Sequence, residues 1–116
     1  MRVFKTKGFS AAAAKAAITD AELCEAMRQV VKGQADNLGG GVWKKRLNEN
    51  RHRSIILAKG GDYWVYQFLF AKKDQDNITN KELLGFKKIA KAYEGLSKEQ
   101  IKDLLKLQEF EEICNV

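Results

Sequence analysis

Three consecutive glycines at residues 39–41 mark the point where the chain changes from a helical to a strand-like pattern. Before them, apolar residues recur at helical spacing from Leu23 to Val31, and Gly33 follows as a stop signal. After them come three strand-like segments, over residues 42–47, 54–59 and 63–71. Because helices also follow these strands, the pattern predicts an α+β fold.

Capping motifs set the expected helix boundaries. A first helix is expected from Ser10 through Ala17, because a serine hydroxyl caps a helix start and alanine is the best helix former. Three later segments fit the capping box, in which a Ser or Thr and a Glu or Gln bond each other's backbone amides: residues 19–22, 79–82 and 97–100. With a short strand over residues 2–6, the expected order is β-α-α-β-β-β-α-α.

These elements predict a small antiparallel β-sheet meander, with two N-terminal helices and the C-terminal helices packed on one face. Residues 63–71 are apolar on both faces, as in a central strand. Gly60-Gly61-Asp62 predicts a tight hairpin before them, since glycine reaches positive φ without strain. No linker divides the 116 residues, so we expect one domain over 1–116, with 97–116 a C-terminal helical extension.

Length arguments and the cysteine pattern exclude several classes of protein. The longest apolar stretch, residues 63–71, is far shorter than the roughly 20 residues of a membrane span. The apolar residues 11–14 are too few for a secretory signal, so a cytoplasmic location is expected. A zinc site needs about four clustered ligands, which one histidine, Cys24 and Cys114 do not supply. We therefore expect no metal or cofactor. Both cysteines are expected to be buried thiols without a redox role.

Positive charge is concentrated in the predicted sheet. The net charge is +6, and residues 1–62 hold twelve Lys and Arg against six Asp and Glu, whereas the remaining residues hold nine of each. Residues 44–59 supply the excess, through Lys44, Lys45, Arg46, Arg51, Arg53 and Lys59. Such a block favours a polyanionic partner such as RNA or DNA. A solvated strand pair whose charged edges prevent aggregation is the alternative.

The spacing of the basic residues suits phosphate chemistry. Strand alternation places Lys44 and Arg46 on one face, roughly 6–7 Å apart, and Arg51 and Arg53 have the same spacing. Arginine binds phosphate bidentately, and clustered cations lower the pKa of a lysine, which can then act as a base. Pairing of these cations with surface carboxylates is the alternative. His52, the sole histidine, is open to three interpretations: a proton donor, a base-stacking ring or no role.

Other sequence signals are negative or point to the core. Most aromatic residues of segment 63–71 are expected in the core, and exposed ones would stack on bases. No P-loop, GxGxxG, HExxH, GxSxG or paired-carboxylate pattern occurs, which disfavours hydrolases of those classes.

Three segments together resemble the RelE/ParE superfamily of bacterial toxin–antitoxin toxins, nearest to its HigB-like and RelE-like members. They are Val3–Lys7, Leu38–Leu47 and Phe70–Ile78. The third is similar to the family pattern FAKN-x-x-x-NI, with Glu82-Leu83 following at the expected place. The resemblance covers about residues 1–95 in order.

The resemblance implies a metal-independent endoribonuclease, an mRNA interferase that inhibits translation by cutting mRNA, often on the ribosome. In such enzymes the RNA 2′-hydroxyl attacks the adjacent phosphate. Matched by motif, the expected catalytic residues are Lys44, Arg46, Arg53 and Lys72. We expect RNA-binding roles for Lys45, Arg51, His52 and Lys73. A cognate antitoxin would cover this face, and operator DNA would be bound only through the antitoxin.

Some features depart from the family pattern. Residues 48–53 lack the glycines of the usual KSGGYR-like loop, and His52 stands where tyrosine is common. Residues 11–14 are alanines in place of bulkier and basic residues, which leaves open an engineered, weakened or inactivated toxin. The alternatives to a nuclease are a non-catalytic nucleic-acid-binding module, an antitoxin-binding module and a ParE-like gyrase inhibitor.

Overall fold

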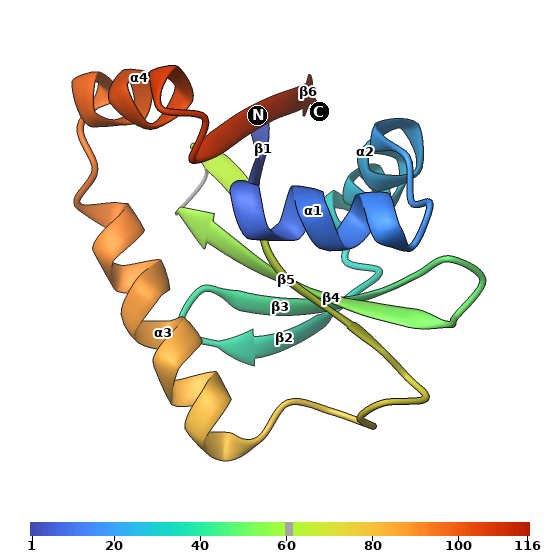
Figure 1. Cartoon of the computed structure of the whole chain (residues 1–116). Coiled ribbons are helices and arrows are strands. Elements are labelled where there is room, and N and C mark those ends of the chain that lie inside the picture. The colour runs from blue at the N-terminus through green and yellow to red at the C-terminus, as the bar shows by residue number, and fades with distance from the viewer. Residues whose placement is uncertain (60–61) are drawn as a thin grey trace.

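The computed structural model describes residues 1–59 and 62–116, with ten elements in chain order (Figure 1). They are β1 (Arg2–Thr6), α1 (Lys7–Lys15), α2 (Asp20–Val31), β2 (Asp36–Gly39), β3 (Val42–Leu47), β4 (His52–Lys59), β5 (Tyr63–Ala71), α3 (Asn80–Glu94), α4 (Lys98–Lys106) and β6 (Phe110–Asn115). The α+β class is therefore confirmed. The turn expected at Gly60-Gly61 lies outside the described residues.

The strands form one mostly antiparallel sheet in the order β2-β3-β4-β5-β1-β6. The predicted meander β3-β4-β5 is confirmed, and β1 adds to β5 in parallel. Both edge strands were missed. β2 has only one partly buried residue, Leu38, and so lacks the apolar alternation that identifies a strand.

The helical extension expected over residues 97–116 is only partly present, because the segment ends in a strand. The helical prediction holds only for α4, because the chain turns at Gln108 (φ 59°) and then forms β6 antiparallel to β1. The charged residues of β6, Glu111 and Glu112, are exposed, and a strand at the sheet edge accommodates them as readily as a helix. The sequence pattern there does not distinguish the two.

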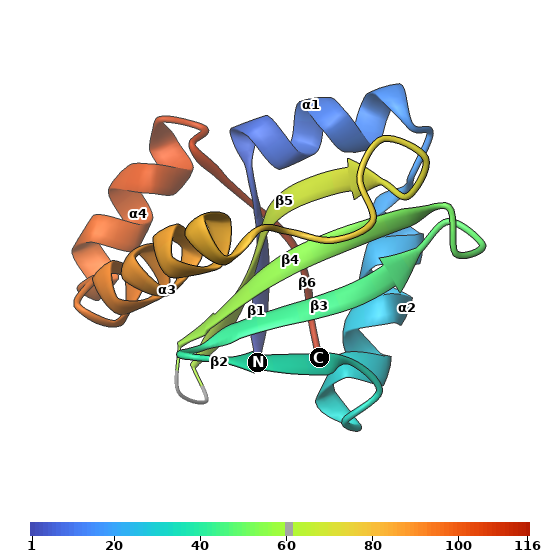
Figure 2. The ribbon, with the colours of Figure 1, turned by 90° about the horizontal axis from the view of Figure 1, so that it is seen from below.

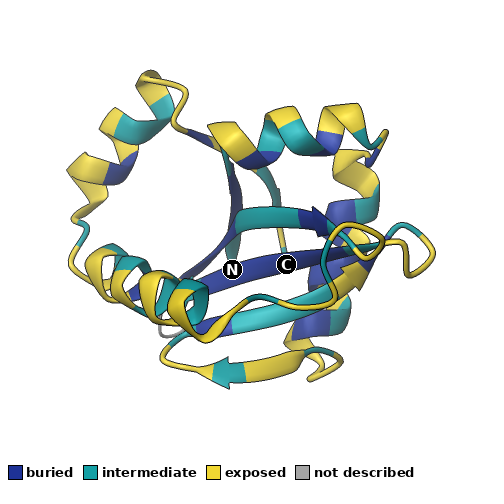
Figure 3. Cartoon of the chain, turned by 60° about the horizontal axis from the view of Figure 1, so that its bottom comes forward, coloured by how far each residue is buried: buried dark blue, intermediate teal, exposed yellow. Residues whose placement is uncertain are grey.

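Helices cover both faces of the sheet rather than one (Figures 2 and 3). On one face lie α1 and α2, where the Tyr66 ring packs 5.0 Å from Phe9 and its hydroxyl donates to the carbonyl oxygen of Leu23. On the other face lies α3, where Ala90 packs in one cluster with Leu57. Beside it, α4 packs over β1 and the start of β5. Most aromatic residues of β5 are buried, as expected.

The first helix begins earlier than predicted. Thr6, not Ser10, is its N-cap, with a hydroxyl that accepts the amide hydrogen of Phe9. The helix ends at Lys15, because Ala17 adopts a left-handed conformation (φ 57°). The capping boxes before α3 and α4 are confirmed in full.

Cys24 and Cys114 form a disulfide that joins α2 to β6, so the prediction of two free thiols is wrong. Their Cα atoms lie 6.2 Å apart although 90 positions separate them in the chain. The error follows from the helical assignment of the C-terminus, which gave no reason to place Cys114 beside α2. No helix of the described residues is long and apolar enough to cross a membrane.

We predict that Cys24→Ser/Cys114→Ser lowers the free energy of unfolding by roughly 2–5 kcal/mol, because the cross-link restricts the unfolded chain over a long loop. Urea denaturation measures the change. As a control, a reductant should destabilise the wild-type chain equally and leave the double variant unaffected. Two titratable thiols in the unreduced wild-type chain would contradict the disulfide.

Candidate functional site

The register of β3 on β4 places Lys44, Arg46 and Arg53 on one face of the sheet. Arg46 lies directly opposite Arg53, and Lys44 lies two residues along the same strand. Val42 occupies the same face further along and is buried in the cluster beneath α3. The helix therefore covers one end of this face, while Arg46 at the other end is exposed.

The surroundings of Lys44 and Arg46 differ. The Lys44 Nζ donates a hydrogen bond to the Asn77 side-chain oxygen at 3.3 Å and lies 3.7 Å from an Asp36 carboxylate oxygen. Pairing with a carboxylate, the alternative considered from the sequence, thus applies to Lys44 in part. The guanidinium of Arg46 lies where an anion can reach it from solvent.

Arg53 supports the local backbone. The residue is 7% exposed, and its Nη1 donates to the carbonyl oxygens of Asn50 at 2.9 Å and His52 at 3.1 Å. Its charge contributes to the potential of the face, while its hydrogen bonds hold the β3–β4 turn (residues 48–51). Arg53 therefore stabilises the turn beside the more exposed Arg46.

Lys45 does not lie on the same face of the sheet as its sequence neighbours Lys44 and Arg46. It shares the opposite face with Trp43 and Leu47, and its Nζ donates to the carbonyl oxygen of Gln34 at 2.8 Å. Partial burial lowers the pKa of the Lys45 amine.

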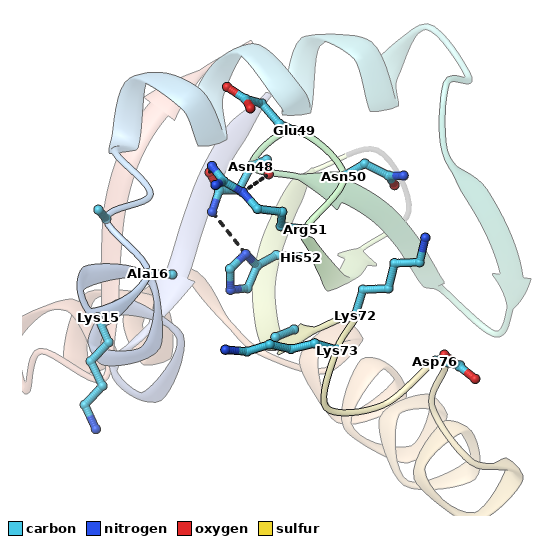
Figure 4. Close-up of a pocket in the computed structure, with 12 residues that line it drawn as sticks. Lys15, Ala16, Asn48, Glu49, Asn50, Arg51, His52, Lys72, Lys73 and Asp76 are labelled. Carbon is cyan, nitrogen blue, oxygen red and sulfur yellow. Dashed lines mark hydrogen bonds between the residues drawn. The ribbon is translucent and has the colours of Figure 1, made fainter.

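A cavity of about 970 Å³ lies at the end of the sheet, beside the β3–β4 turn (Figure 4). Its walls are the C-terminal end of α1, the β3–β4 turn and the start of the β5–α3 connection. The basic residues lining it are Lys15, Arg51, His52, Lys72 and Lys73, and the acidic ones are Glu49 and Asp76. Four of the predicted site residues therefore meet here. Lys15 was missed, because nothing in the sequence places the end of α1 beside residues 48–52.

Lys72 lines the cavity, and its backbone is fixed beside the β3–β4 turn. Its backbone amide donates to the Arg51 carbonyl oxygen at 2.9 Å, which extends the pairing of β4 and β5 by one step. In Figure 4 the side chains of Lys72 and Lys73 diverge, with Lys73 directed toward His52 and Lys72 away from it. Ammonium groups on the wall of a cavity suit an anionic ligand.

The β3–β4 turn has three consecutive residues in the left-handed region: Asn48, Glu49 and Asn50, with φ of 55°, 54° and 70°. Asparagine tolerates this conformation, whereas for glutamate it is unfavourable. The Glu22 carboxylate in the first turn of α2 stabilises the turn by accepting the Asn48 amide hydrogen at 2.6 Å. The predicted capping box at 19–22 is therefore only half formed, because Thr19 caps the helix but Glu22 binds the turn.

Comparison with known proteins gives one match. A family model described as "RelE toxin of RelE / RelB toxin-antitoxin system" matches residues 1–113. No curated protein and no solved structure matches the chain. Among the described residues, no group of three or more His, Cys, Asp or Glu side chains is placed to hold a metal ion.

We predict that Glu22→Ala lowers the free energy of unfolding by about 1–3 kcal/mol, because the Asn48 amide loses its charged acceptor. Urea denaturation measures the loss, and faster hydrogen exchange at the Asn48 amide localises it to the turn. Glu25→Ala is the matched control, since Glu25 is exposed and its ion pair, at 3.2 Å, is with Arg28 one helical turn away. Equal stabilities of the two variants would show that the turn does not depend on Glu22.

Proposed function

Because this chain belongs to the RelE toxin family of toxin–antitoxin systems, we propose that it is a toxin that cleaves mRNA as a metal-independent endoribonuclease. In the proposed reaction the 2′-hydroxyl oxygen attacks the adjacent phosphorus and the bond to the 5′-oxygen breaks. A 2′,3′-cyclic phosphate and a 5′-hydroxyl result. The attack needs cations around a phosphate whose charge increases in the transition state.

The observation that carries this proposal is the shared face of Lys44, Arg46 and Arg53 beside the cavity that Lys72 lines. We assign Lys44, Arg46 and Lys72 to holding and activating the scissile phosphate. Arg53 contributes charge and keeps the turn in place through its bonds to backbone carbonyls. Like charges directly opposite each other on a sheet are unfavourable, and a phosphate bound at Arg46 and Arg53 would offset this cost.

The residues of the cavity are assigned to the neighbouring nucleotides. Arg51, His52 and Lys73 line it and would bind the phosphate next to the scissile one. Lys45 lies on the face of the sheet opposite to Lys44 and Arg46. A contact of Lys45 with RNA would therefore lie outside the cavity. In this proposal residues 1–116 act as one toxin domain.

Membership in the family implies an antitoxin as partner. We propose that the antitoxin covers the basic face and thereby blocks mRNA, and that operator DNA is bound only through the antitoxin. The proposed substrate is mRNA on the ribosome, which places the action in the cytoplasm. A bound antitoxin segment would need acidic side chains to match Arg46 and Lys72.

We predict that the purified chain cleaves mRNA in the presence of translating ribosomes and that Lys44→Ala/Arg46→Ala reduces the rate about 100-fold. Mapping of RNA 5′ ends over time measures cleavage, and a parallel reaction with free mRNA measures the dependence on ribosomes. Lys98→Ala/Lys106→Ala is the matched control, because it removes the same charge from exposed positions of α4.

Full activity of the Lys44→Ala/Arg46→Ala variant would contradict the site assignment. Binding of mRNA by the wild-type chain without any cleavage products would contradict the nuclease and indicate a non-catalytic binding module.

A further inference from the structure

A chain of hydrogen bonds runs along the cavity wall from Arg51 through Asn48 to His52 (Figure 4). The Arg51 Nη2 donates to the Asn48 Oδ1 at 3.0 Å, and the Arg51 Nε donates to the Asn48 carbonyl oxygen at 3.2 Å. The Asn48 Nδ2 lies 3.1 Å from the His52 Nδ1. Three side chains of one turn are thus connected in a fixed order.

The arginine determines the direction of this chain. A guanidinium has donors and no acceptor, so the Asn48 amide must turn its oxygen toward Arg51. The NH₂ group of Asn48 then faces His52, and because that group only donates, the His52 Nδ1 must accept. In the neutral imidazole the proton consequently resides on Nε2.

The backbone holds His52 in this place. It is the first residue of β4 and pairs with Leu47 on one side and Ala71 on the other. Asn48 is fixed as well, because its amide hydrogen is bound by the Glu22 carboxylate. Hydrogen bonds therefore fix the backbones of both His52 and its ring's partner Asn48.

The cavity around His52 favours an anionic acceptor. In Figure 4 the ring lies between Asn48 and Lys73, on the wall of a cavity that Lys15 and Lys72 also line. The carboxylates that line the same cavity are fewer than its cations. An N–H donor among ammonium groups suits a phosphate oxygen.

We infer that His52 binds an RNA phosphate through a proton fixed on Nε2, and that it is not the base that removes the 2′-hydroxyl proton. A base would need a lone pair on Nε2 and hence a proton on Nδ1, where it would meet the N–H of Asn48. The RNA ligand rests on the proposed function, whereas the fixed tautomer follows from Arg51 and Asn48 alone.

The tautomer is tested by long-range ¹H–¹⁵N NMR of the free, full-length chain at pH 8, where its one histidine gives an unambiguous signal. The expected spectrum has a protonated Nε2 and an unprotonated Nδ1. Asn48→Asp is the matched variant, because aspartate keeps the shape and accepts from both neighbours. The substitution should shift the ring proton from Nε2 to Nδ1, where the Nδ1–H donates to the new carboxylate. A wild-type ring protonated at Nδ1, or no change in Asn48→Asp, would overturn the inference.

The phosphate contact is tested with a single-stranded RNA that carries 2′-O-methyl groups and so cannot be cleaved by 2′-hydroxyl attack. Fluorescence anisotropy should show that His52→Asn weakens binding about tenfold, because asparagine reaches only the position of Nδ1. His52→Gln should weaken it less, because its amide nitrogen reaches the position of Nε2. Equal losses in both variants, or no loss in either, would overturn the contact.

The two proposals fail separately. Failure of the wild-type chain to bind any RNA would overturn the proposed function together with the ligand assigned to His52. A ring protonated at Nδ1 would overturn only the inference about His52 and leave Lys44 and Arg46 as the proposed site.

Discussion

The register of the β3–β4 hairpin determines which face of the sheet each basic side chain occupies. A slip of one residue would move Lys44 and Arg46 to the other face, beneath the N-terminal helices. Two contacts hold this register at the turn: Glu22 accepts the Asn48 amide hydrogen, and Arg53 donates to the carbonyl oxygens of Asn50 and His52. The turn thus combines an unfavourable backbone with strong charged hydrogen bonds, a combination typical of functional sites.

This turn also explains why the basic face and the cavity are adjacent. Strand alternation directs Arg53 to the face that α3 partly covers and His52 to the cavity. One short segment therefore supplies residues both to the basic face and to the cavity, which Lys72 also lines. In the proposed function, the regularly spaced phosphates of a single RNA strand would contact the basic face and the cavity together.

The sequence was sufficient where local rules apply. Alternation correctly assigned Lys44 and Arg46 to one face, and the hydroxyl caps at Thr79 and Ser97 marked the starts of α3 and α4. It was insufficient where distant segments meet. β6 and the disulfide depend on the C-terminus returning to β1, and the cavity depends on Lys15 approaching the β3–β4 turn. The contact of Glu22 with the turn could not be predicted, because its local pattern is fully explained as a capping box, which Glu22 does not complete.

We propose that the face of Lys44 and Arg46 holds the scissile phosphate of RNA. A crystal structure of the full chain with an RNA carrying a 2′-O-methyl group at the scissile nucleotide tests it most directly. We expect one phosphate within hydrogen-bond distance of Arg46 and Lys44 and the next phosphate in the cavity beside His52. RNA bound over the outer surface of α1 or α3, with this face empty, would contradict it.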